Sequence, residues 1–495
     1  MRSSVSRRCG AAGAAVGLLV SGALAGISSS ADAAVTRPVV KLEQARGTIT
    51  TESYENMVYL DLGVFVVAGA QPFEIRAQRA SYDEPINAVR VRTGTDEPLP
   101  TGLVKDFYGL TNFFSLSIDN AAGRRVVNQL VPFCPNGYQT VRRRPDAPAT
   151  SPYPQGCAGN PYSTGAVWGI QKGHGASALD YLPLNLRPGT YTATVSITSA
   201  YRNFLHLRPA DSSATVTVKV VPEADEMSAA RAARRPGATS SQTSSPAPAA
   251  TRPTGPAIQE AGPLPDLRSL PAWAVSVDRG RYLDFAATVW NAGPSGLVVD
   301  GFRRDNDENL MDAYQYFYDS AGQQIGYEQV GTMEWDERDG HTHWHFTDFA
   351  SYRLLNANKQ LVVRSQKEAF CLANTDAVDY TLEGANWRPE NTDLHTACGD
   401  QSSIAVREVL DAGSGDTYLQ YLPGQSFDLQ GLANGVYYIE VLANPDSRLR
   451  ESSTANNSSL RKVTISGTPG KRKAVAEKIG IVVEPPLFDE MSAAR

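Results

Sequence analysis

The sequence predicts an all-β protein: two immunoglobulin-like β-sandwich domains joined by a disordered linker, after an N-terminal signal peptide. Short alternating segments, such as residues 191–197, 214–220, 282–289 and 437–441, are separated by Gly, Pro and Asn, and long helical periodicities are missing. Residues 239–256 are rich in Ala, Pro, Ser and Thr and have almost nothing to bury, so they cannot offset their ordering entropy. A chain of 495 residues has room for two or three domains, and its net charge of −6 gives no reason to expect a nucleic-acid partner.

The N-terminus has the features of an export signal. A start with three arginines is followed by an apolar run of small residues at 11–27, and Ala31-Asp32-Ala33 offers a cleavage site. These features predict a signal peptide over residues 1–34 and a secreted protein. Arg7-Arg8 leaves twin-arginine export open, although the two residues after this pair fit that route poorly. No later stretch is apolar for long enough to span a bilayer, so we expect a soluble mature protein.

The two halves of the mature chain resemble each other. Leu179-Asp-Tyr-Leu-Pro183 and Leu419-Gln-Tyr-Leu-Pro423 are each followed by a turn and then by a strand-like segment that begins near Tyr191 or Tyr437. This similarity predicts a duplication of one sandwich. The expected parts are an N-terminal sandwich at 35–221, a Pro/Ala/Ser-rich linker at 222–263, a second sandwich at 264–467 and a C-terminal tail at 468–495.

A seven-residue segment occurs twice without change. Asp225-Glu-Met-Ser-Ala-Ala-Arg231 recurs as Asp489-Glu-Met-Ser-Ala-Ala-Arg495. The segment is either a remnant of the duplication or a short docking or processing element used twice, in which case it has a partner of its own. The sequence does not choose between these interpretations.

The cysteines fit an exported protein with disulfides. Removal of the signal peptide leaves Cys134, Cys157, Cys371 and Cys398, two in each half. Because export exposes thiols to oxidising conditions, the expected pairs are Cys134–Cys157 and Cys371–Cys398. Crossed pairs stay open, and a four-cysteine zinc site is disfavoured because no C-x-x-C spacing occurs.

Three of the six histidines stand at alternate positions, His341, His343 and His345. Alternate residues of a β-strand point to the same face, so the three imidazoles would lie side by side. Neutral imidazole is the commonest protein ligand for copper, zinc, iron and nickel. Three protein ligands leave an open coordination position, which is typical of a catalytic metal. By themselves the residues leave hydrolytic zinc and redox copper as alternatives.

Further segments surround the histidines in a fixed order: Trp335, Phe349–Asn358, Lys367-Glu-Ala-Phe-Cys371-Leu-Ala-Asn-Thr375, Gly415-Asp416-Thr417-Tyr418, and Glu451-Ser-Ser-Thr-Ala-Asn456-Asn457. With the H-x-H-x-H strand they make the chain from about Leu264 to Ile465 resemble the catalytic domain of lysyl oxidases, the secreted copper- and quinone-dependent amine oxidases. Two departures concern loop geometry. This domain has fewer cysteines than the animal enzymes, and the stretch Phe346–Asp348 is one residue shorter.

The resemblance implies a role for each matching residue. The three histidines would hold Cu²⁺, and Lys367 and Tyr418 would form lysine tyrosylquinone with the help of copper and dioxygen. Asp416 would be the general base that removes a proton from the amine substrate, with His395 as the second candidate. The substrates would be primary amines, including lysine side chains of proteins, which are converted to aldehydes with release of hydrogen peroxide and ammonia.

The N-terminal half lacks these groups. Aligning the two L-x-Y-L-P segments places Ala176 opposite Asp416 and Ala178 opposite Tyr418. This half is therefore expected to be non-catalytic, a binding or spacer domain.

Two other functions stay open, a His₃ zinc hydrolase or lyase and a non-catalytic metal-binding β-sandwich protein of the cell surface. Acidic residues at 305–308 and 334–339, among them Asp336, precede the histidines. We expect them to lie near the mouth of the site, where they would favour amines with additional positive charge.

Overall fold

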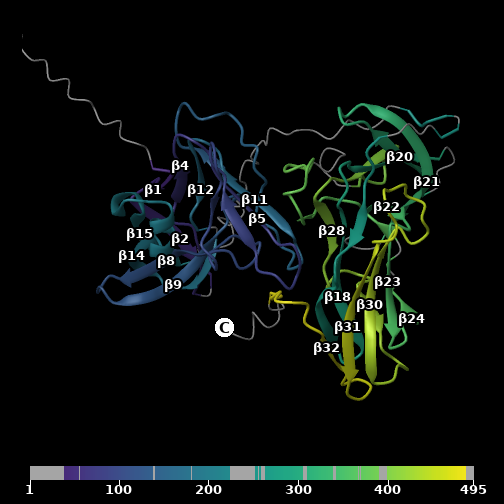
Figure 1. The fold of residues 1–495 in the computed structure, drawn as a ribbon. Helices are drawn as coiled ribbons and strands as arrows, with labels where there is room; N and C mark the ends of the chain where they lie inside the picture. Colours follow the sequence, from purple (N-terminus) through teal and green to yellow (C-terminus); the bar gives the residue numbers. More distant parts are fainter. Residues whose placement is uncertain are drawn as a thin grey trace, which may run out of the picture. The chain divides into compact units, whose positions relative to one another are not determined.

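The computed structural model describes residues 38–54, 56–137, 140–179, 181–222, 251–254, 256–257, 262–304, 309–337, 342–365, 367, 369–389 and 398–485. These residues form mostly β-strands (Figure 1), with one α-helix described, α1 (Ser199–Phe204), and one 3₁₀ turn, η1 (Pro209–Asp211). The all-β prediction is therefore confirmed. The predicted signal peptide, most of the linker and both copies of the seven-residue repeat lie outside the described residues. In the described part of the chain, no helix is long and apolar enough to cross a membrane.

The first half contains three main sheets and a two-stranded pair. The first sheet has the order β1 (Val40–Gln44), β4 (Val64–Ala68), β12 (His174–Ser177) and β10 (Thr140–Arg142). The second has the order β11 (Gly165–Ile170), β5 (Phe73–Gln78), β6 (Asn87–Arg90) and β7 (Glu97–Pro98). The third has the order β2 (Thr48–Ser53), β15 (Ser213–Pro222), β14 (Gly189–Ile197), β8 (Leu110–Asn120) and β9 (Arg125–Phe133). The pair is β13 (Leu182–Asn185) with β3 (Met57–Leu60).

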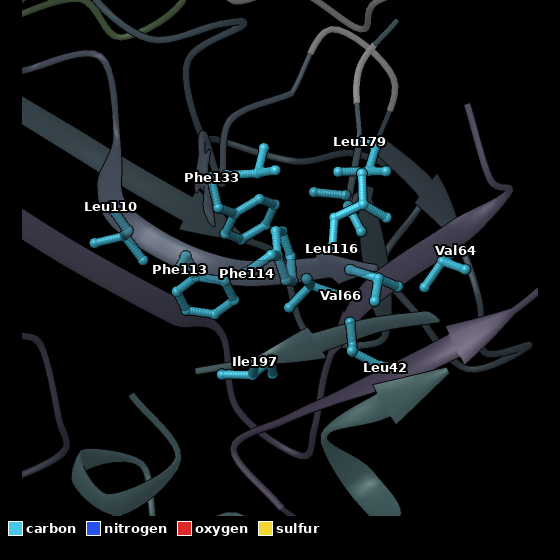
Figure 2. Packing of buried hydrophobic residues seen from close by; sticks show 14 of the residues in the cluster. Leu42, Val64, Val66, Leu110, Phe113, Phe114, Leu116, Phe133, Leu179 and Ile197 are labelled. Carbon is cyan, nitrogen blue, oxygen red and sulfur yellow. The ribbon is translucent and has the colours of Figure 1, made fainter. Parts of the chain in front are cut away.

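Apolar side chains from these sheets form one core. Alternation along β8 and β14 points every second side chain inward, which is the pattern of a strand with one solvated face. Phe113, Phe114 and Phe133 pack ring against ring, with centroids 4.8–5.2 Å apart, and Leu42 and Val66 lie in the same cluster (Figure 2).

The second half also has three sheets. One contains β16 (Leu267–Ser269), β18 (Tyr282–Asn291), β28 (Ser414–Tyr418) and β26 (Asp376–Ala377), and β17 (Trp273–Asp278) and β29 (Ser426–Asp428) also pair with β18. A six-stranded sheet has the order β25 (Ala369–Phe370), β22 (His343–Thr347), β21 (Gln324–Asp336), β20 (Leu310–Tyr318), β19 (Leu297–Arg303) and β27 (Ala405–Leu410). The last has the order β24 (Leu361–Arg364), β23 (Ala350–Asn356), β30 (Gly435–Ala443), β31 (Ser458–Ser466) and β32 (Lys473–Ala476). Most of their inward side chains form a second core.

The strand orders of the two halves correspond. The sheet β1-β4-β12-β10 has the same order of connections as β16-β18-β28-β26, and β11-β5-β6-β7 corresponds to β27-β19-β20-β21. The central strands β15-β14-β8-β9 correspond to β31-β30-β23-β24. In both halves a tyrosine at the start of the penultimate long strand donates its hydroxyl to the carbonyl four residues earlier, Tyr191 to Arg187 and Tyr437 to Ala433, each at 2.8 Å. Such a tyrosine corner is typical of Greek-key sandwiches and supports the predicted duplication.

The second half differs by two added strands. β22 and β25 extend the sheet beyond β21, and no strand of the first half occupies the equivalent place in the described residues. The predicted disulfides Cys134–Cys157 and Cys371–Cys398 are both present, and each joins the segments on either side of an equivalent short strand, β10 or β26. The predicted metal and lysine motifs therefore lie on the addition, whereas the disulfides belong to the shared framework.

Candidate active site

Two of the three predicted metal ligands lie on β22. This strand pairs with β21 on one side, where Asp336 is opposite His343, and with β25 on the other, where Phe370 is opposite Phe346. Trp344 and Phe346 point into the second core, which leaves His343 and His345 together on the other face. The alternation expected from the sequence is therefore present at these two residues.

The two imidazoles are close enough to share one ion. Their Nε2 atoms are 2.9 Å apart, and their ring centroids are separated by 4.6 Å. Two nitrogens bound to one metal at about 2.0 Å lie roughly 2.8–3.3 Å apart when they subtend 90–110° at the ion. The donor pair fits copper or zinc equally well on this criterion. His341 lies outside the described residues, among which no group of three potential metal ligands is gathered.

Asp336 supports this pair from behind. Its Oδ2 lies 3.3 Å from Nδ1 of His345, and both side chains are buried, with 8 % and 1 % exposure. A carboxylate on the second nitrogen of a ligating histidine fixes the ring and its tautomer. Asp336 therefore lies beside the histidines, as its place in the sequence suggested, but it is buried and is not part of an exposed acidic rim. Its neighbours Glu334 and Glu337 are exposed. The sequence could not reveal this contact because it depends on the register between β21 and β22.

A second cluster brings together Lys367, Tyr418 and Asp416. The side chain of Lys367 is buried, and its Nζ lies 4.4 Å from the centroid of the Tyr418 ring and 5.3 Å from that of Phe370. Asp416 and Tyr418 are both buried and stand at alternate positions of β28, opposite Val289 and Ala287 of β18. Asp416 lies 49 positions after Lys367 in the sequence, so it is the fold that brings the three residues together.

Backbone contacts hold the tyrosine ring in place. Its hydroxyl accepts a hydrogen bond from the amide of Cys371 at 3.0 Å and donates one to the carbonyl of the same residue at 3.1 Å. The ring of Phe370 meets Tyr418 edge to face, with centroids 5.2 Å apart. Gly424, at φ +84°, packs against Lys367, where an added Cβ would be 3.0 Å from the lysine Cβ.

Exclusion of water from the cluster shifts the pKa values of its ionisable groups. Burial raises the pKa of Asp416 well above its ordinary value, and the Lys367 ammonium opposes this shift. Burial also raises the pKa of Tyr418, and the nearby carboxyl of Asp416 adds to this effect. Tyr352 and Glu408 raise the pKa of Tyr418 further. Neither was expected from the sequence, because no motif marks either residue.

The disulfide connects the two clusters. Cys371 holds the hydroxyl of Tyr418, and its partner Cys398 accepts a hydrogen bond from the backbone amide of Trp344, which lies between the two histidines, at 3.0 Å. The indole of Trp344 also donates to the carbonyl of Asp400 at 2.9 Å. The second candidate base, His395, lies outside the described residues.

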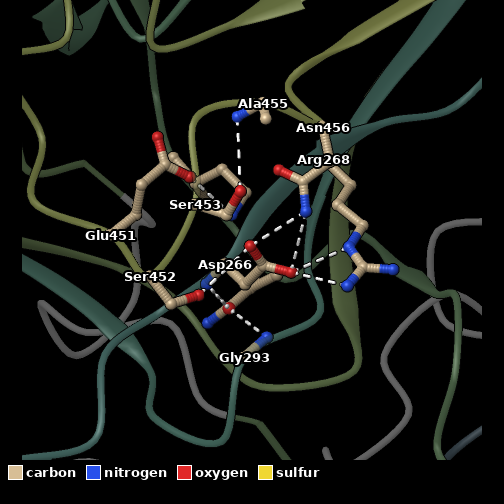
Figure 3. Close-up of polar contacts among 10 residues, drawn as sticks. Asp266, Arg268, Gly293, Glu451, Ser452, Ser453, Ala455 and Asn456 are labelled. Atoms are coloured by element: carbon tan, nitrogen blue, oxygen red, sulfur yellow. Dashed lines mark hydrogen bonds and ion pairs between the residues drawn. The ribbon is translucent and has the colours of Figure 1, made fainter.

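The final sequence motif has a structural task. Asp266 accepts hydrogen bonds from Ser452 and Asn456 and pairs with Arg268 (Figure 3). Glu451 accepts the amide of Leu267 at 2.8 Å and side-chain bonds from two asparagines. The 451–457 loop thus fastens β16 to the third sheet and contributes no group to either cluster.

Comparison with known proteins was consistent with these motifs. Residues 319–473 match the family model described as Lysyl oxidase. Lysyl oxidase homolog 3A of Danio rerio is 28 % identical over 130 residues, which are 26 % of this chain and 16 % of that protein. Lysyl oxidase homolog 2 of Xenopus tropicalis is 27 % identical over 132 residues, 26 % and 15 % of the two chains, and homolog 3 of Homo sapiens is 27 % identical over 133 residues, again 26 % and 15 %. The matched segment thus spans about one sixth of the length of these relatives.

Proposed function

Because the C-terminal half of this chain contains a lysyl oxidase family domain, we propose that the protein is a secreted copper-dependent amine oxidase whose quinone is formed from Lys367 and Tyr418. The observation that carries the proposal is the buried contact between the Lys367 amine and the Tyr418 ring, 4.4 Å from nitrogen to centroid, beside a buried carboxyl. A His₃ zinc hydrolase requires neither Lys367 nor Tyr418 for its chemistry. This contact therefore favours the oxidase over that alternative.

The residues divide into metal-holding and substrate-facing groups. His343 and His345, with His341 as the predicted third ligand, would hold copper, and Asp336 would orient His345. Copper would supply the redox chemistry that converts Tyr418, and the resulting quinone would supply an electrophilic carbonyl and accept two electrons.

Asp416 would act as the general base. It is positioned two residues from Tyr418 on the same face of β28 and would take the proton from the carbon that bears the substrate amine. Its burial excludes water, and its raised pKa makes the ionised carboxylate a stronger base than an exposed one. The net reaction converts a primary amine, dioxygen and water to an aldehyde, ammonia and hydrogen peroxide.

The substrate class follows from the same resemblance. We infer primary amines, including lysine side chains of proteins, with a preference for additional positive charge near Glu334 and Glu337, which are exposed on and just after β21.

Peptide mapping of protein matured with copper and dioxygen tests the proposal. A covalent Lys367–Tyr418 adduct should appear, together with amine-dependent release of hydrogen peroxide, and both should be missing in Lys367→Arg. Lys359 is a matched control within the same chain, because its Nζ lies 5.8 Å from the ring of Tyr438 but both residues are distant from the histidine strand in sequence. Absence of the adduct in a copper-loaded protein, or equal adducts at both pairs, would contradict the proposal.

A further inference from the structure

A cavity lies on the opposite face of the strand that carries Asp416 and Tyr418. On β28 these two residues point into the second core, whereas Thr417 and the following Leu419 line a cavity of about 780 Å³. This volume is within the range of small-molecule sites, roughly 300–1,000 Å³. Because strand side chains alternate, the cavity is distinct from the proposed oxidase centre.

Both halves of the chain contribute walls. β11 of the first half contacts the segment after β26, where the amide of Gly165 donates to the carbonyl of Val378 and the amide of Tyr380 donates to the carbonyl of Gly165. Tyr108 and Trp168 line the cavity from the first half, and Trp273, Tyr380 and Trp387 line it from the second. Five aromatic rings around one cavity provide large apolar faces with negative π-surfaces.

A single carboxylate lines this aromatic space. Asp376 accepts hydrogen bonds from the amide of Gly159 at 3.1 Å and from the hydroxyl of Thr417 at 3.3 Å. Among the described residues, no lysine or arginine pairs with it. The one guanidinium in the lining, that of Arg388, donates instead to the carbonyls of Ser151 and Tyr153.

A largely enclosed carboxylate that has no lysine or arginine partner within the described ranges favours a cationic ligand. Enclosed charges are stable in proteins when they are paired, and aromatic faces attract alkylammonium groups. An anionic ligand would meet repulsion from Asp376. Burial also raises the pKa of this carboxyl to about 6, so it is ionised at neutral pH and available to a cation.

We propose that this cavity binds an alkylammonium group, such as a lysine side chain of a protein ligand, between Asp376 and the aromatic walls. This site goes beyond the proposed oxidase function because it needs neither copper nor quinone and lies on the other face of β28. It also gives the non-catalytic half a task, since Tyr108 and Trp168 complete the walls.

Binding of a non-oxidisable probe to the full-length protein tests the proposal. The probe is Nα-acetyl-Nε-trimethyllysine methylamide, whose quaternary nitrogen has no proton to lose and cannot react as a primary amine. Its neutral counterpart is Nα-acetylnorleucine methylamide. Calorimetry measures affinity, and quenching of tryptophan fluorescence reports occupancy because three tryptophans line the cavity. We expect the trimethyllysine probe to bind roughly tenfold or more tightly than the neutral one.

Variants locate the site and separate it from the oxidase. Asp376→Asn keeps one oxygen, for the amide of Gly159, and places an NH2 group beside the hydroxyl of Thr417, which can then accept instead of donating. This change should weaken binding of the cation roughly tenfold, and Trp387→Leu should weaken it as well. Glu383→Gln removes an exposed charge nearby on the chain and should leave binding unchanged. Asp416→Asn, which disables the proposed oxidase, should also leave binding unchanged. Equal binding of the two probes, or loss in Asp416→Asn but not in Asp376→Asn, would overturn the proposal whether or not the protein oxidises amines.

Discussion

Replacement of Tyr418 by phenylalanine separates its structural contribution from its chemical one. The change deletes a hydroxyl that satisfies both the amide and the carbonyl of Cys371, at 3.0 and 3.1 Å. Each buried polar group left without a partner costs about 1–3 kcal/mol. Because Cys371 is only half-buried, we expect the lower part of the sum for two such groups, about 2–4 kcal/mol, as the loss in the free energy of unfolding.

Tyr437→Phe is the matched control. Its hydroxyl makes one hydrogen bond, 2.8 Å to the carbonyl of Ala433, and Ala433 is exposed, so water can replace the lost partner. We expect a loss of about 1 kcal/mol and unchanged amine oxidation. Tyr418→Phe should also abolish the Lys367 adduct and hydrogen peroxide release.

Denaturant unfolding with a peroxide assay measures both effects on the same samples. If Tyr418→Phe is no less stable than Tyr437→Phe, the hydrogen bonds to Cys371 do not hold the ring as described. Residual amine oxidation in Tyr418→Phe would refute the quinone assignment independently.

Further predictions concern the metal, the base and the disulfide. His343→Ala and His345→Ala should greatly reduce copper loading measured by metal analysis, whereas His206→Ala, at an exposed position, should not. Asp336→Asn should weaken copper binding about 10–100-fold, with Glu334→Gln as the exposed control on the same strand. The pKa of Asp416 is raised in the folded state, so the protonated carboxyl stabilises the fold, and this stability is lost as the pH rises through the folded-state pKa. Asp416→Asn should therefore lose amine oxidation but become more stable, relative to the parent protein, as the pH rises. Equal pH dependence of the free energies of unfolding of the two proteins would contradict this. Removing Cys371–Cys398 or Cys134–Cys157 by serine should cost about 3 kcal/mol each because their loops are similar, 27 and 23 residues, but only the first should reduce Lys367–Tyr418 cross-linking, as peptide mapping would show.

The features that could be predicted from the sequence are those that depend on residues close together in the chain. The β-rich architecture followed from alternation and turn residues, and the two disulfides from one cysteine pair in each half. Lys367, Asp416 and Tyr418 were nominated by flanking motifs, and the structure brings them into one cluster. By contrast, the contact of Asp336 with His345 and that of Cys398 with Trp344 depend on strand register and loop path, for which a single sequence has no signal. The cavity near Asp376 was also missed, because its walls come from residues up to several hundred positions apart.

The correspondence between the halves explains why only one of them carries candidate chemistry. In the first half, the strand equivalent to β28 is β12, and the aligned residues Ala176 and Ala178 are buried with 0 % and 3 % exposure. Their small side chains leave the core apolar, whereas Asp416 and Tyr418 place a carboxyl and a phenol in the same environment, which raises the pKa of both. The histidines and Lys367 lie on or beside β22 and β25, the strands that the first half lacks in its described residues. A shared order of strands therefore supplies the frame and the disulfide. The candidate site also requires two strands added to one sheet, and ionisable side chains buried in a core that is apolar at the equivalent positions of the first half.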